Sequence, residues 1–141
     1  KICENLKKIK PNIKLALGGP EVTYDSKSAM EKYKFIDYIL YGEGELVFKD
    51  LIMHLEGDLK IEETEGIVYR KDDEIIVNKE KPLLENLDDI PSPYENLDPK
   101  EYENRIVYYE TSRGCPFNCQ YCLSSTLKGL RYFSIDRVKK I

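Results

Sequence analysis

The hydrophobic and polar positions of residues 1–56 alternate between two periods, which predicts strands alternating with helices. Short apolar runs that end at glycines indicate strands, whereas apolar residues three and four positions apart indicate amphipathic helices. The predicted elements are a helix over 1–10, a strand over 13–17, a helix over 26–34, a strand over 35–40 and a helix over 46–55. Because strands that alternate with helices form right-handed βαβ units, this order predicts a parallel α/β sheet.

The same periodicity predicts which side chains of the helices face the core. The expected inward-facing residues are Ala29, Met30 and Tyr33 in one helix, and Phe48, Leu51, Ile52 and Leu55 in the next. Cys3 lies on the apolar face of the first helix, together with Ile2, Leu6 and Ile9. A small buried thiol is its expected role.

The pattern changes after residue 56. Residues 66–70 and 74–78 flank a polar turn, which indicates a β-hairpin. Residues 105–111 form a strand-like run, and Ser134 is a plausible N-cap of a helix in which Ile135, Val138 and Ile141 recur at helical spacing.

These changes divide the chain into four parts. We expect an α/β part over 1–56, a hairpin extension over 57–85, a linker over 86–104 and the start of a second domain over 105–141. The linker is predicted from Pro91, Pro93 and Pro99, which lie among acidic residues and asparagines.

Three cysteines lie within eight residues, with the spacing C-x3-C-x2-C: Cys115, Cys119 and Cys122. Three thiolates can bind one face of a [4Fe–4S] cluster but leave one iron open, because full ligation needs four. Zinc is the alternative, and a structural zinc site would need Cys3 or His54 as a fourth ligand. A disulfide framework is typical of small secreted scaffolds, a class that this chain does not fit.

The cysteine spacing, the aromatic Tyr121 directly before the third cysteine and the preceding strand-like run resemble the cluster motif of the radical S-adenosylmethionine (radical SAM) superfamily. The resemblance implies that the three cysteines hold three irons and that SAM chelates the fourth. An external electron donor then drives cleavage of SAM to a 5′-deoxyadenosyl radical. Tyr121 would lie near the adenine of SAM. No catalytic residue is assigned within the chain.

The residues around the cysteines have two possible roles each. Gly114 either aims backbone N–H groups at the cluster or only permits a turn, and Arg113 either offsets the thiolate charge or pairs with a nearby acid. Phe117 and Tyr121 either shield the cluster or simply pack. Four further aromatic residues are expected in the core: Tyr108, Tyr109, Tyr132 and Phe133.

Two glycine motifs follow the first two predicted strands: Gly18-Gly19-Pro20-Glu21 and Gly42-Glu43-Gly44-Glu45. In an open parallel sheet, ligands bind at the carboxyl ends of strands, and glycine lets the backbone approach them closely. A motif of either kind, taken alone, is more often an ordinary turn or helix start than a ligand site.

Together, the two motifs resemble the C-terminal half of the cobalamin-binding domain that precedes many radical SAM barrels. The resemblance implies that Gly18 and Gly19 lie against the nucleotide tail of cobalamin, with Gly42, Glu43 and Gly44 at the same site. The family's Asp-x-His-x-x-Gly cobalt-ligand motif is absent from this chain. His54 is therefore expected to be a helix-surface or half-buried residue.

The expected fold class is α/β. A partial Rossmann-like (flavodoxin-like) parallel sheet is followed by a hairpin, a linker, and the first strand and cluster loop of a (β/α) radical SAM barrel. Since a complete barrel needs about 250 residues, we expect the 141 residues to be an inactive fragment of a larger enzyme. The expected reaction is methyl transfer or other radical chemistry on an unidentified substrate, by an oxidoreductase or transferase. The alternatives are a [4Fe–4S] electron carrier or redox sensor, and a zinc-stabilised interaction domain.

Composition narrows the setting. Charged residues make up 34% of the chain and the net charge is −4, without a Lys/Arg-rich run interleaved with aromatics, which argues against a nucleic-acid surface. No apolar run approaches the length of a membrane span. Clustered reduced cysteines indicate a cytoplasmic protein.

Overall fold

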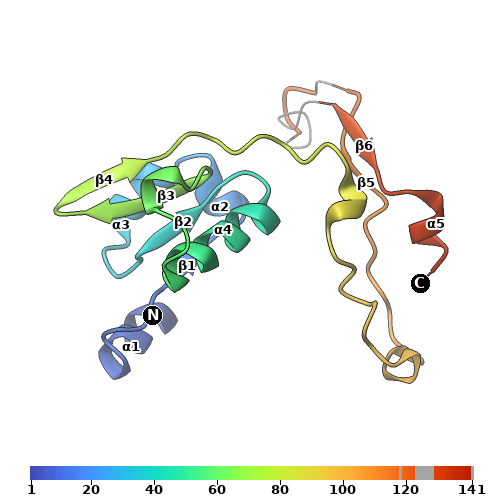
Figure 1. The fold of residues 1–141 in the computed structure, drawn as a ribbon, viewed down its shortest axis with the longest axis horizontal. Coiled ribbons are helices and arrows are strands. Elements are labelled where there is room, and N and C mark those ends of the chain that lie inside the picture. The colour runs from blue at the N-terminus through green and yellow to red at the C-terminus, as the bar shows by residue number, and fades with distance from the viewer. Residues whose placement is uncertain (118, 123–128, 141) are drawn as a thin grey trace. The chain divides into compact units, whose positions relative to one another are not determined.

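The computed structural model of the chain describes residues 1–117, 119–122 and 129–140. The chain forms two compact units, Lys1–Leu83 and Leu84–Ile141, and each has its own internal contacts (Figure 1). No helix among the described residues has the length and apolar character that crossing a membrane requires.

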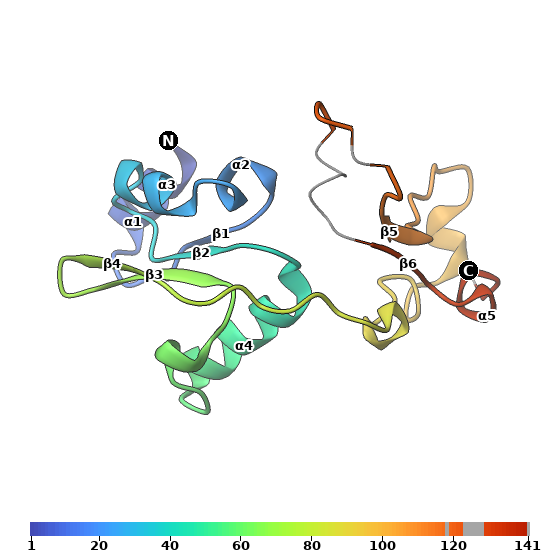
Figure 2. The ribbon, with the colours of Figure 1, turned by 90° about the horizontal axis from the view of Figure 1, so that it is seen from above.

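The first unit is a four-stranded mixed sheet with helices on both faces. Its elements are α1 (Ile2–Ile9), β1 (Ala16–Leu17), α2 (Pro20–Thr23), α3 (Ser26–Lys32), β2 (Tyr38–Leu40), α4 (Gly44–Glu56), a 3₁₀ turn (Ile61–Glu63), β3 (Ile67–Lys71) and β4 (Glu74–Val77). Strands β1 and β2 are parallel, as predicted, and the predicted hairpin β3–β4 continues the same sheet in antiparallel order. Figure 2 shows α2 and α3 on one face of this sheet and α4 on the other.

Two cores form because successive residues of β2 point to opposite faces. Ile39 packs with Met30 of α3, whereas Tyr38 packs with Leu51 of α4. Met30 and Ile39 have no exposed surface. Ala29 and Tyr33 are partly buried against the first core, so the inward face predicted for this helix is confirmed.

Helix α4 turns a different face to the sheet from the one its spacing predicts. Val47 is fully buried and Leu51 is 2% exposed. The other three residues of the predicted stripe are exposed, at 53% for Phe48, 37% for Ile52 and 44% for Leu55. The helix carries two overlapping apolar faces, and Gly66 determines which of them packs on the sheet. A Cβ at residue 66 would lie 2.6 Å from Val47 Cγ2, so Val47 can be buried there only because Gly66 has none.

Helix α1 contacts the core through Cys3, which is partly buried, although full burial was predicted, while Ile2 and Ile9 remain exposed. Lys7 lies one turn after Cys3 on the same face. Its Nζ bonds to Asp37 Oδ2 at 2.6 Å and to the carbonyl oxygen of Ile13 at 2.7 Å. This partly buried ion pair orients the helix, and it leaves Ile2 and Ile9 79% and 76% exposed.

Replacing Gly66 by alanine is expected to lower the free energy of unfolding by about 3 kcal/mol, from backbone strain and overpacking together. Gly66 has φ +77°, and an added Cβ would also lie 3.1 Å from the carbonyl oxygen of Tyr41. Gly57→Ala is the matched control, because Gly57 has φ +95° and no described atom within 4 Å of the added Cβ. It should cost only about 1 kcal/mol, the strain alone. Urea denaturation followed by circular dichroism compares them, and equal losses would contradict the packing role of Gly66.

The second unit is built around a two-stranded antiparallel ladder. Its elements are 3₁₀ turns at Leu87–Asp89 and Pro99–Tyr102, strands β5 (Ser112–Gly114) and β6 (Leu130–Tyr132), and helix α5 (Ile135–Val138). The predicted cap of α5 is confirmed, since Ser134 Oγ accepts the N–H of Arg137 at 3.2 Å. Ile141 lies outside the described residues.

The strand predicted over residues 105–111 is wrong. These residues have no regular structure, and Ile106 and Tyr108 are each 81% exposed. A strand forms only where a neighbour completes its hydrogen bonds. That neighbour is β6, which pairs with Ser112–Gly114, and the pairing continues only as far as the N–H of Phe133 to the carbonyl oxygen of Thr111, at 3.0 Å.

The aromatic residues of this unit divide between a core and the surface. Phe133 is 8% exposed, and its ring centroid lies 6.3 Å from that of Tyr109, which in turn lies 6.3 Å from that of Tyr94. Tyr108 and Tyr132, also predicted in the core, are 81% and 65% exposed. Neighbouring residues of an extended segment point to opposite faces. Tyr109 therefore packs beside Tyr94, whereas Tyr108 lies on the exposed face.

Candidate functional site

The three cysteines lie on a segment whose two ends are held together by the β5–β6 ladder. Strand β5 ends at Gly114, directly before Cys115, and Gly114 is paired with Leu130. Gly114 has φ +91°, and a Cβ added to it would lie only 1.9 Å from the carbonyl oxygen of Gly129. The segment therefore leaves and re-enters the unit at one point, and only glycine permits that close approach.

Each of the three cysteines is half-buried, and none of the four cysteines of the chain is in a disulfide. The N–H of Cys122 donates to the carbonyl oxygen of Cys119 at 3.1 Å. Such an i→i+3 turn brings the two Cα atoms to within about 7 Å. Among the described residues, no three His, Cys, Asp or Glu side chains form a group that could hold a metal ion. The metal ligands therefore remain a prediction, to which the donor set of three thiols on one closed loop is suited.

The structure shows one of the two roles considered for Arg113, an ion pair with a nearby acid. Its Nε bonds to Glu110 Oε2 at 2.9 Å, and its side chain is 15% exposed. Pairing with a nearby acid is thus observed. Phe117 and Tyr121 are 68% and 92% exposed, so neither is buried in the described part of the chain.

The two glycine motifs leave the same edge of the sheet. In the parallel pair, Leu17 is opposite Ile39, so Gly18 follows one strand where Leu40 ends the other. A Cβ added to Gly18 would lie 3.7 Å from the carbonyl oxygen of Leu40. The tertiary structure therefore brings together two motifs that are 24 positions apart, from Gly18 to Gly42.

The backbone of this glycine edge is accessible. Gly19 and Gly42 have φ +99° and +81°, and no described atom lies within 4 Å of a Cβ added to either residue or to Gly44. Glu43 is half-buried directly before α4. An open edge without side chains at these positions suits a large flat ligand that must approach the main chain closely.

Helix α2 was not predicted, although its signal is present in the sequence. Pro20 occupies its first turn, a position that proline favours, and Glu21 suits the helix dipole. The hydroxyl of Thr23 donates to the carbonyl oxygen of Gly19 at 2.9 Å. Helix α2 thus begins directly after Gly19 and fixes the direction in which the chain leaves the first glycine motif.

His54 is half-buried on α4, as predicted. Its Nδ1 lies 3.0 Å from the carbonyl oxygen of Leu59, and its ring meets Tyr38 edge-on with centroids 6.3 Å apart. These contacts give the imidazole a packing role at the second core.

Comparison with known proteins decides the family. The chain is 36% identical, over 97% of its length, to the uncharacterized methyltransferase PH0819 of Pyrococcus horikoshii, of which it covers 31%. It is 30% identical, over 99% of its length, to the cobalamin-dependent radical SAM methyltransferase TokK of Streptomyces tokunonensis, of which it covers 22%. The chain belongs to the cobalamin-associated radical SAM family. It thus spans about a third or less of the length of these curated relatives.

The fold of this radical SAM chain agrees with a solved structure. The cobalamin-dependent S-adenosylmethionine radical enzyme OxsB, with aqua-cobalamin and S-adenosylmethionine bound, matches 99% of the chain with a TM-score of 0.74. The chain covers 19% of OxsB and is 24% identical to it, a level that shows the fold alone. The α/β class predicted from the sequence is confirmed. No protein-family model matches the chain.

Proposed function

We propose that this chain is part of an enzyme that cleaves SAM reductively at a [4Fe–4S] cluster and, with cobalamin, transfers a methyl group to an unidentified substrate. The observation that carries the proposal is the closed loop of Cys115, Cys119 and Cys122 on the β5–β6 ladder. The relatives PH0819 and TokK are both named as methyltransferases, which supports methyl transfer over other radical chemistry.

The three thiolates supply the chemistry of the first site. A cluster held by three cysteines keeps one iron open, and when bound it supplies the electron that breaks a C–S bond of SAM. The metal enforces deprotonation of the thiols. The exposed ring of Tyr121, directly before the third cysteine, is available to stack on adenine.

The glycine edge supplies the second site. Gly18 and Gly19 would contact the nucleotide tail of cobalamin, and Gly42, Glu43 and Gly44 would line the same edge. Open backbone at three glycines of the two motifs, Gly19, Gly42 and Gly44, supports this assignment, because a Cβ would stand where the ligand approaches. The thiols must stay reduced, so we place the enzyme in the cytoplasm with an external electron donor as partner.

The test is anaerobic reconstitution of the full-length protein with iron and sulfide, followed by EPR of the reduced cluster with and without SAM. We expect a [4Fe–4S]⁺ signal that changes when SAM is added, because SAM would bind the open iron. A cluster signal indifferent to SAM would overturn the proposal in favour of an electron carrier or redox sensor. Colourless protein with one zinc per chain would instead indicate a zinc-stabilised interaction domain.

A further inference from the structure

Tyr41 joins β2 to the second glycine motif. Both its backbone N–H and its side-chain hydroxyl form hydrogen bonds to residues that flank the β3–β4 hairpin. Its backbone N–H donates to the carbonyl oxygen of Gly66 at 2.9 Å, and its hydroxyl donates to the carbonyl oxygen of Asn78. Gly66 precedes β3 and Asn78 follows β4, so both acceptors lie at the open end of the hairpin. Burial, with the carboxylates of Glu80 and Glu65, raises the pKa of the Tyr41 hydroxyl, which stays protonated as a donor at neutral pH.

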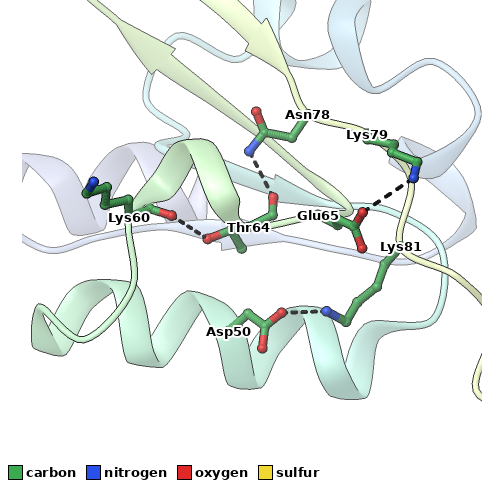
Figure 3. A network of polar contacts seen from close by, with 7 residues as sticks. All are labelled: Asp50, Lys60, Thr64, Glu65, Asn78, Lys79 and Lys81. Atoms are coloured by element: carbon green, nitrogen blue, oxygen red, sulfur yellow. Dashed lines mark hydrogen bonds and ion pairs between the residues drawn. The ribbon is translucent and has the colours of Figure 1, made fainter.

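The open end of the hairpin is itself fixed by a polar network (Figure 3). The N–H of Gly66 donates to the carbonyl oxygen of Lys79 at 2.7 Å. The side-chain amide of Asn78 donates to the carbonyl oxygens of Ile61 and Thr64 at 2.7 and 2.8 Å. Thr64 is fully buried. Because buried polar groups are costly to leave unpaired, this network sets the position of the acceptor that Tyr41 uses.

The segment that follows β4 also holds helix α4, the element after the motif. Lys81 Nζ lies 2.5 Å from Asp50 Oδ2 of α4, and the two side chains are only 21% and 20% exposed (Figure 3). Val47 of α4 packs into the space that Gly66 leaves. Helix α4 begins at Gly44, so the motif is a short span between Tyr41 and α4, both of which are attached to residues that flank the hairpin.

The span itself is open to a ligand. Gly42 and Gly44 have no described atom within 4 Å of an added Cβ, whereas Tyr41 is half-buried. A backbone that is held at both ends and uncovered between them is preorganised, and it loses little conformational entropy when a ligand binds.

We propose that the β3–β4 hairpin positions Gly42, Glu43 and Gly44 for cobalamin, with Tyr41 as the positioning residue and the Lys81–Asp50 ion pair as a second anchor. The identity of the ligand rests on the proposed function. Tyr41 acts through the backbone of the motif, and its hydroxyl is directed at the hairpin.

The experiment compares Tyr41→Phe with Tyr69→Phe in the full-length protein. Both remove one hydroxyl from an aromatic residue of the same sheet, but Tyr69 lies in the core opposite Tyr38. Tyr41→Phe should weaken the binding of hydroxocobalamin, measured by equilibrium dialysis, by about fivefold, the equivalent of one hydrogen bond. It should also speed amide hydrogen exchange of residues 42–44 in the cobalamin-free protein, and Tyr69→Phe should do neither.

Lys81→Met tests the second anchor and should weaken hydroxocobalamin binding in the same direction. If the wild type binds hydroxocobalamin and Tyr41→Phe binds it equally well, the positioning role is overturned while the proposed function stands. If the wild type binds none, the cobalamin part of the proposed function fails, and the positioning role fails with it. Exchange at residues 42–44 that Tyr41→Phe leaves unchanged would also overturn the inference, independently of any ligand.

Discussion

Alanine at any one of Cys115, Cys119 and Cys122 is expected to abolish the reduced-cluster EPR signal of the full-length protein. Three thiolates already leave one iron without a protein ligand, and a second open iron would release the cluster. Iron content after anaerobic reconstitution should fall from about four atoms per chain to a small fraction of that amount. Iron and acid-labile sulfide analyses measure this loss, and cleavage of SAM should disappear with the iron.

Cys3→Ala is the matched control for this loss. Cys3 lies on α1, half-buried against the core of the first unit, and it is not part of the C-x3-C-x2-C motif, so its removal is expected to change packing in that unit. It should leave the iron content unchanged. A triad variant with full iron content would contradict the ligand assignment, and loss of metal from Cys3→Ala would favour a zinc site that recruits Cys3.

Gly114→Ala is expected to have an effect almost as large, although alanine removes no ligand. The added Cβ would lie 1.9 Å from a backbone oxygen of Gly129, and φ at this residue is +91°. Backbone strain and overlap together cost about 3 kcal/mol, which favours an unpaired ladder by about a hundredfold. We expect most of the iron to be lost after reconstitution, because the ends of the cysteine loop no longer meet.

Gly129→Ala separates this overlap from backbone strain alone. Gly129 has φ +83°, but no described atom lies within 4 Å of its added Cβ. It should retain most of the iron. Hydroxocobalamin binding by both variants reports whether the first unit is intact. Equal iron content in the two variants would show that the close approach of Gly114 to Gly129 is not required.

The motifs were readable from the sequence because each depends on neighbours in the chain. The cysteine spacing, Ser134 before α5, and the apolar runs that end at Gly18 and Gly42 all act over a few residues. The polar turn of the hairpin is equally local. These signals were sufficient to predict the alternation of β1, α3, β2 and α4, and the hairpin that follows.

The errors occurred where local signals needed a partner from elsewhere. Residues 105–111 have strand-forming composition, but β6 pairs with Ser112–Gly114 instead. The apolar stripe of α4 was assigned to the wrong face because the space beside Gly66 accepts Val47. Propensity sets what a segment favours, and tertiary packing overrides it.

The sequence by itself determined the α/β class, the three thiols and the two glycine motifs, since residue type and short spacing carry that information. Only the tertiary structure decided that Gly18 and Gly42 share one edge, that Gly114 closes the cysteine loop against Gly129, and that the hairpin holds Tyr41. Each of these is a contact between segments far apart in the chain. Such contacts depend on register and on the space left by a missing Cβ, which no local pattern specifies.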